Sequence, residues 1–286
     1  MPEALGAVFG TVPGVAFAFA FFLLLAAKPL KRWERGSALP GFGFGALSFA
    51  AGIAAGAALV VATIAIAIAA GDAGFSARPV NDIPGGRGIE MEWARFLSFL
   101  LFAAVREELM IRAYLLLVPF WCACAAIETM AGKASARARG ALAAAAFCAL
   151  LAGQAIVFAL MHADNPNATS FALVNVALAG ALFGIAAAGK GGFYAAAGMH
   201  WAINLTYEVF NLPISGIEFD TGFHSFAIVL SEGGAAGGGA FGLEGGWAMT
   251  AALILGIAVA VGWLRKQTKS VFSAGAAGSG SAAPRE

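Results

Sequence analysis

Long runs of apolar residues constrain this chain more than any other feature of its sequence. Only 12% of its 286 residues are charged, whereas a typical water-soluble domain carries about 25%. A helix needs about 20 mostly apolar residues to cross the hydrocarbon core of a bilayer. Seven segments reach that length, namely residues 6–27, 44–70, 93–127, 141–162, 170–188, 192–212 and 247–264. We therefore expect an all-α, polytopic transmembrane helical bundle of about seven (six to eight) membrane-spanning helices.

The positive charges are distributed unevenly between the connecting segments. Only Arg78, Arg87 and Arg95 fall on one predicted side of the membrane. Twelve of the 17 Lys and Arg residues fall on the other side, at positions Lys28, Lys31, Arg32, Arg35, Lys133, Arg137, Arg139, Lys190, Arg265, Lys266, Lys269 and Arg285. Because positively charged loops stay in the cytoplasm, this pattern predicts an N-terminus outside and a cytoplasmic C-terminus. The net charge of +1 gives no support for a nucleic-acid partner. The scarcity of charged residues makes the lipid bilayer the expected partner.

Four charged residues lie within seven positions of the third apolar segment, in the sequence Arg106-Glu107-Glu108-Leu-Met-Ile-Arg112. Each charge at the centre of a membrane helix costs about 2.5–3.5 kcal/mol, so such groups are candidates for function. Glu108 and Arg112 are four residues apart, which predicts an ion pair on one helix face. Glu107 is turned about 100° away and is free for chemistry. The alternative is a structural ion-pair cluster that holds the helices together.

Two further apolar segments carry polar side chains at helical spacing. They are Gln154, Phe158 and His162 in the fourth segment, and His200, Asn204 and Glu208 in the sixth. Each set alone is compatible with an interfacial histidine or with hydrogen bonds between helices. Together with a glutamate, the polar groups provide a carboxylate, two imidazoles and an amide, which can activate water and stabilise an oxyanion. We therefore expect an intramembrane polar cavity.

In chain order the motifs are Glu107-Glu108-x-x-x-Arg112, Phe158-x-x-x-His162 and His200-x-x-x-Asn204. This ordered trio resembles the signature of the CPBP family of intramembrane glutamic endopeptidases. The family includes the type II CAAX prenyl proteases and Abi-like proteins linked to bacteriocin processing and immunity. The stretch from Asn175 to Gly184 also resembles the glycine-bearing helix that joins the second and third motifs. The resemblance covers roughly residues 96–211.

The resemblance implies an intramembrane endopeptidase that hydrolyses a peptide bond in a membrane-associated or lipidated, CAAX-like protein or peptide. Glu107 would be the general base that polarises the attacking water. His162 would position or activate that water, and His200 with Asn204 would stabilise the tetrahedral oxyanion. The two histidines must then lie at one depth, although the expected spans place them apart. We expect the fourth segment to end inside a cavity, before residues 164–167.

The same resemblance implies structural roles for the remaining motif residues and leaves two alternatives. Glu108 and Arg112 would hold the first motif in place, and Phe158 would shape the cavity. Glu107 and the two motif histidines have the composition of a His₂/Glu zinc site, but the resemblance favours a metal-free glutamate mechanism, so we expect no cofactor. A non-catalytic immunity or transporter-like protein would keep the same fold. The complete set of catalytic-type residues argues against that second alternative.

The expected organisation places the protease core at residues 93–212. Transmembrane helices and an outside loop precede it, at 1–92. A Gly-rich acidic loop follows at 213–246 and is expected to be a flexible connector. A C-terminal transmembrane helix occupies 247–272, and a disordered tail occupies 273–286. The Ala- and Gly-rich composition suggests a bacterial inner membrane.

Overall fold

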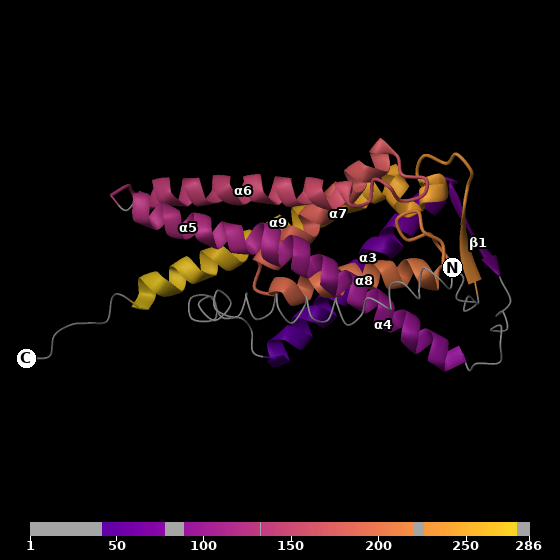
Figure 1. Ribbon diagram of the computed structural model, residues 1–286, viewed down its shortest axis with the longest axis horizontal. Coiled ribbons are helices and arrows are strands. Elements are labelled where there is room, and N and C mark those ends of the chain that lie inside the picture. The colour runs from indigo at the N-terminus through magenta and orange to yellow at the C-terminus, as the bar shows by residue number, and fades with distance from the viewer. Residues whose placement is uncertain (1–41, 78–88, 132, 220–225, 279–286) are drawn as a thin grey trace, which may run out of the picture. The chain divides into compact units, whose positions relative to one another are not determined.

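The computed structural model describes residues 42–77, 89–131, 133–219 and 226–278. Its α-helices are α3 (Phe42–Ala69), α4 (Ile89–Glu108), α5 (Val118–Met130), α6 (Ala136–Leu160), α7 (Ser170–Ala188), α8 (Gly192–Val209) and α9 (Trp247–Gly278) (Figure 1). A π-helical segment, η1 (Leu109–Leu117), joins α4 to α5. Two short 3-10 helices, η2 (Gly239–Phe241) and η3 (Leu243–Gly245), precede α9. The described part of the chain is therefore mainly helical, as predicted.

Five of the described helices are long and apolar enough to cross a membrane, namely Gly45–Ala69, Arg95–Met130, Ala136–Leu160, Ser170–Ala188 and Trp247–Lys266. They correspond to five of the seven predicted segments. The sixth predicted segment, at 192–212, contains α8, which is not among these five. The first predicted segment, at 6–27, lies outside the described residues. A count of about seven spans therefore stays a prediction, as does the orientation in the membrane.

Helix α8 packs against α3, α4 and α7. Its contact with α3 is made backbone to backbone, because a Cβ atom at Gly52 would clash with the carbonyl oxygen of Ala195. A Cβ atom at Gly56 would likewise clash with the carbonyl oxygen of Met199, and one at Gly198 with that of Phe49. Small residues allow such close approach between membrane helices, which increases their dispersion contacts. This tight contact fixes the position of the helix that carries His200 and Asn204.

Helices α6 and α7 pack against each other in a similar way. Gln154 is buried, and its Nε2 donates to the carbonyl oxygen of Gly180 at 2.9 Å. A Cβ atom at Gly180 would lie only 3.2 Å from the ring of Phe158. Each helix begins at a capping hydroxyl, because Ser135 accepts the backbone N–H of Ala138 in α6 and Thr169 accepts that of Ala172 in α7. The packing brings Phe158, near the end of α6, into the core.

A small antiparallel sheet joins the loops at one end of the helices. Strand β1 (Ala73–Ala77) pairs with β2 (Phe226–Leu230), with Phe75 opposite Ile228. The backbone N–H of Ile228 also donates to the carbonyl oxygen of Phe210 at 2.9 Å, just beyond α8. The sheet thereby ties the segment after α3 to the segment before α9.

The Gly-rich segment before α9 is folded against the bundle, which corrects the expectation of a flexible connector. The Asp72 carboxylate accepts the backbone N–H of Ala236 at 2.6 Å. A Cβ atom at Gly246 would clash with the carbonyl oxygen of Ala236. Gly238 has a φ of +81°, a left-handed conformation that side chains disfavour. The glycines of this segment therefore serve tight turns and close packing.

The predicted domain boundaries stay predictions, with one exception at the C-terminal end. Helix α9 continues to Gly278, so the helix does not end at residue 272. The described residues from Phe42 onward belong to one compact unit.

Candidate active site

The first motif lies where α4 passes into the π-helical segment. Helix α4 ends at Glu108, and the wider turns begin at the next residue, Leu109. Single π-helical turns inside α-helices occur frequently at functional sites. Although the wider turns change the spacing, Nε of Arg112 lies 3.1 Å from Oε2 of Glu108. The ion pair predicted from the sequence is therefore present.

Arg112 and Glu108 are both completely buried, with 0% of either side chain exposed. The guanidinium carbon of Arg112 lies 4.3 Å from the ring centroid of Phe158 and 5.1 Å from that of Phe183. A cation over an aromatic face gains about 2 kcal/mol when it is desolvated. The two rings thus stabilise the buried arginine alongside its carboxylate. Phe183 was not predicted as a site residue, although it is a large aromatic in a helix rich in Ala and Gly.

His200 lies between the two adjacent glutamates. Its Nδ1 is 2.9 Å from Oε1 of Glu108, and its Nε2 is 3.8 Å from Oε2 of Glu107. The ring of Phe183 stacks on the imidazole, with centroids 5.0 Å apart and planes inclined by 15°. Glu108 therefore orients His200 as well as Arg112, a contact that the sequence did not predict. Held in this way, His200 presents Nε2 to Glu107.

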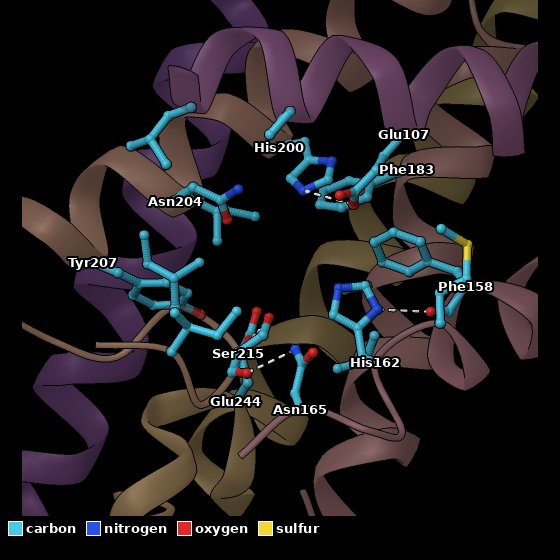
Figure 2. A pocket seen from close by; sticks show the side chains of 18 of the residues that line it. Glu107, Phe158, His162, Asn165, Phe183, His200, Asn204, Tyr207, Ser215 and Glu244 are labelled. Atoms are coloured by element: carbon cyan, nitrogen blue, oxygen red, sulfur yellow. Dashed lines mark hydrogen bonds and ion pairs between the residues drawn. The ribbon is translucent and has the colours of Figure 1, made fainter. Parts of the chain in front are cut away.

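His162 lies in the turns that follow the end of α6 at Leu160. Its Nδ1 is 2.8 Å from the carbonyl oxygen of Phe158. Because a carbonyl oxygen only accepts hydrogen bonds, Nδ1 carries the proton in this contact. In the neutral ring Nε2 is then an acceptor, and Figure 2 shows that nitrogen facing the hollow of the site. Helix α6 therefore ends at this hollow. This is the arrangement expected if His162 and His200 lie at the same depth.

One cavity, with a volume of about 320 Å³, brings the predicted catalytic residues together. Glu107, His162, His200 and Asn204 all line it, and they come from three separate segments of the chain (Figure 2). The side chain of Glu107 is 16% exposed, and its Oε1 also lies 3.5 Å from the exposed Arg106. Of the two adjacent glutamates, only Glu107 is reached from the cavity.

Three polar residues were predicted to share one face of α8, and two of them line the cavity. His200 and Asn204 line the cavity, whereas Glu208 is buried and is not among the lining residues. Tyr207 lines the cavity in its place. The Tyr207 hydroxyl is buried and has no hydrogen-bond partner within the described part of the chain. A substrate or water in the cavity is therefore a suitable partner for it.

A further glutamate, Glu244 in η3, lines the cavity together with Ser215. The Ser215 hydroxyl donates to Oε2 of Glu244 at 2.6 Å, and Nδ2 of Asn165 donates to the carbonyl oxygen of Ser215 at 2.9 Å. Figure 2 shows Glu244 across the hollow from Glu107. Sequence reasoning missed this glutamate because it lies in an irregular segment, where no helical spacing connects it to the motifs.

Burial and hydrogen bonding act on Glu244 in opposite directions. Desolvation raises the pKa of Glu244, while the Ser215 hydroxyl and the imidazoles of His162 and His200 favour the charged form. Desolvation is the largest of these effects, so the pKa of Glu244 lies above its ordinary value. This carboxyl group keeps its proton to a higher pH than a glutamate in water.

The zinc alternative drew on Glu107, His162 and His200. Within the residues that the structure describes, no group of three His, Cys, Asp or Glu side chains is arranged to hold a metal ion. The metal-free mechanism stays a prediction, which a chelation experiment tests.

Residues 89–206 match the family model described as type II CAAX prenyl endopeptidase Rce1-like. This segment belongs to the Rce1-like family. The match confirms the family that the motifs indicated, and it indicates a CAAX-type intramembrane protease. The apolar helices agree with an integral membrane protein. No curated protein and no solved structure is significantly similar to the chain.

The Rce1-like segment contributes only part of the cavity. It contains all three motifs, from Glu107 to Asn204, and it ends within α8. Tyr207, Ser215 and Glu244 lie beyond it, yet they line the same space. The Rce1-like core and the segment after it therefore enclose the site together.

Proposed function

We propose that this Rce1-like protein is an intramembrane endopeptidase that hydrolyses a peptide bond in a membrane-associated or lipidated, CAAX-like protein or peptide. The observation that carries the proposal is the convergence of Glu107, His162, His200 and Asn204 on one cavity. Taken separately, each residue has a structural explanation. Together they supply a base, a second water-binding group and two oxyanion donors, which is the set that amide hydrolysis needs.

Two acceptors are suited to hold the attacking water. The carboxylate of Glu107 faces the cavity, and Nε2 of His162 faces it as a lone-pair acceptor. A water molecule between them would donate one hydrogen to each, which orients its oxygen lone pair toward a substrate carbonyl. Glu107 then takes the proton as the oxygen attacks, which is the general-base role that the family resemblance implies for it.

Two donors on α8 are suited to stabilise the oxyanion. Asn204 offers its side-chain amide, and His200 offers Nε2. Because Nδ1 of His200 donates to Glu108, Nε2 donates to an oxyanion only when the ring carries both protons. The carboxyl groups of Glu108 and Glu107 lie 2.9 Å from Nδ1 and 3.8 Å from Nε2 of this ring, respectively. The anchoring contact with Glu108 thus serves the chemistry as well as the packing.

An apolar wall supports a substrate held in the membrane. Phe99, Leu100 and Phe219 line the same cavity as the polar residues. The rings of Phe99 and Phe219 lie with their centroids 6.1 Å apart. Such a wall excludes water from the scissile bond and favours an apolar or lipidated chain over a soluble one. The bilayer is then the second partner of the protein.

We also propose a bacterial inner membrane as the location, with the N-terminus outside and the C-terminus in the cytoplasm. The one-sided distribution of Lys and Arg supports this orientation. The orientation is measured with a reporter that is active on one side of the membrane only and is fused to each terminus in turn. An outside signal at the N-terminus with a cytoplasmic signal at the C-terminus agrees with the proposal, and any other combination contradicts it.

The proposed function is tested by comparing membrane peptides from cells that express the wild type with those from cells that express Glu107→Gln. The exposed Glu128→Gln on α5 is the matched control, because it removes the same charge away from the cavity. We expect a cleavage product that is present with the wild type and the control and absent with Glu107→Gln, at equal protein abundance. Identical peptides from all three strains would favour a non-catalytic binder instead.

A further inference from the structure

Glu244 is held in place from several directions. The side-chain amide of Asn175 donates to its backbone carbonyl oxygen at 2.8 Å, and the Ser215 hydroxyl donates to its carboxyl group at 2.6 Å. Thr250 in turn donates to the amide oxygen of Asn175 at 2.7 Å. Ser215 has a φ of +48°, an uncommon conformation for a residue other than glycine. Strained residues of this kind persist where the surrounding structure holds them, and they cluster at functional sites.

Glu244 has no Lys or Arg ion-pair partner among the residues that the structure describes. Glu108, in contrast, is paired with Arg112. The titratable groups that line the cavity with Glu244 are Glu107, His162, His200, Tyr207 and Arg106. Burial away from water favours the protonated form of Glu244 more than these neighbours favour its charged form. A structural role alone does not account for a carboxyl group in this position.

The position of Glu244 complements that of Glu107. Figure 2 shows the two carboxyl groups on opposite sides of the hollow, with His162 and Asn204 between them around its rim. Amide hydrolysis needs a base for the attacking water and an acid for the departing amine. Two carboxyl groups in different environments are a common way to divide these tasks. Glu107 is in the right place for the first task, which leaves the second to Glu244.

We propose that Glu244 is a second catalytic carboxyl group and that it protonates the amine that leaves when the peptide bond breaks. Glu107 takes one proton from water, and the resulting hydroxide oxygen bonds to the carbonyl carbon. When the oxyanion collapses, the C–N bond breaks and its electron pair passes to nitrogen. Glu244 gives its proton to that nitrogen and becomes a carboxylate. Proton transfer through water from Glu107 to Glu244 then restores both groups.

This inference rests on the proposed function. The experiment is therefore designed so that a failure of the inference can be told from a failure of the proposed function. The probes are two synthetic substrates with the same prenylated acyl part. In the first, a peptide amide is the bond to be cleaved, and its amine needs a proton to leave. In the second, a 4-nitrophenyl ester is cleaved, and its leaving group departs as a stable anion without a proton. Purified full-length protein in detergent is assayed with both.

We expect Glu244→Gln to slow cleavage of the amide by about 10²–10⁴-fold and to change cleavage of the ester less than about threefold. Glu232→Gln, an exposed glutamate in the same segment, should leave both rates unchanged. Equal slowing of amide and ester by Glu244→Gln, or no slowing of either, would overturn this inference while the proposed function stands. Cleavage of neither substrate by the wild type would overturn both.

A second variant keeps the test valid if Glu244→Gln does not fold. Ser215→Ala removes a hydrogen bond that favours the charged carboxylate, so the pKa of Glu244 should rise. Because the amide reaction needs Glu244 protonated, its rate falls as the pH rises through that pKa. We expect the falling limb of the rate profile to move to higher pH in Ser215→Ala. An unmoved limb contradicts the assignment.

Discussion

Glu108 holds the imidazole of His200, with Oε1 of the carboxylate 2.9 Å from Nδ1 of the ring. Its other oxygen, Oε2, lies 3.1 Å from Nε of Arg112. One buried carboxylate thus connects the first motif to the third, and it sets which ring nitrogen of His200 faces the cavity. The two adjacent glutamates of the first motif therefore have different tasks, because Glu108 organises the site while Glu107 remains accessible from the cavity.

Replacing Glu108 should destabilise the protein far more than replacing Glu107. Glu108→Ala leaves Arg112 buried without its carboxylate, which costs about 3–5 kcal/mol for a buried pair. Glu107→Ala removes a partly exposed group whose contact with Arg106 is 3.5 Å long and weak. Thermal unfolding of the two purified variants in one detergent measures the difference. Similar unfolding temperatures for both variants would contradict the separate roles.

Asn204→Ala should lose activity while it keeps its stability. Removal of one oxyanion donor lowers kcat by about 10²–10³-fold, because the amide stabilises charge that exists only in the transition state. Asn204 lines the cavity and lies in the middle of α8, where alanine is a good helix former. Cleavage kinetics and thermal unfolding, measured on the same preparation, check the prediction. A raised KM with an unchanged kcat would assign Asn204 to substrate binding instead.

The ion pair within the first motif was predictable from spacing alone. Glu108 and Arg112 are four residues apart, and their ion pair forms although π-helical turns begin between them. The π-helical segment itself was not predictable, because no residue pattern distinguishes it from an apolar α-helix. The anchoring of His200 by Glu108 was also missed, because it joins residues 92 positions apart on different helices.

Phe183 and Glu244 show why the rest of the site escaped prediction. Phe183 stacks on His200 and faces Arg112, but in the sequence it is one of many apolar residues in its helix. Glu244 reaches the cavity only because tight glycine turns fold its segment back on the helices. Helical periodicity predicts neighbours along one helix, whereas these contacts arise from packing between distant segments.

Stability should depend on pH through Glu244. Its pKa is raised above the ordinary value of 4.5, so the folded state holds this proton more tightly than the unfolded state does. The resulting stabilisation is present below pH 4.5 and is lost as the pH rises through the folded-state pKa. Glu244→Gln is always neutral, so its unfolding temperature should exceed that of the wild type increasingly as the pH rises toward neutrality. A difference that does not change with pH would contradict the raised pKa.

Chelation should leave the activity unchanged. The proposed chemistry uses Glu107 and His162 to activate water and assigns no step to a metal ion. Cleavage of the prenylated amide substrate is measured before and after treatment with 1,10-phenanthroline, and the zinc content of the purified protein is measured by mass spectrometry. Loss of cleavage on chelation, with recovery when Zn²⁺ is added, would support the zinc alternative.

The central claim is that Glu107 activates the water that hydrolyses the peptide bond. The most direct measurement is the rate at which purified Glu107→Gln cleaves the prenylated amide substrate, compared with the wild type at equal folded concentration. Glutamine keeps the size of the side chain and removes its basicity, so we predict a loss of about 10²–10⁴-fold or more at an unchanged unfolding temperature. Cleavage by Glu107→Gln at a rate close to that of the wild type would contradict the account.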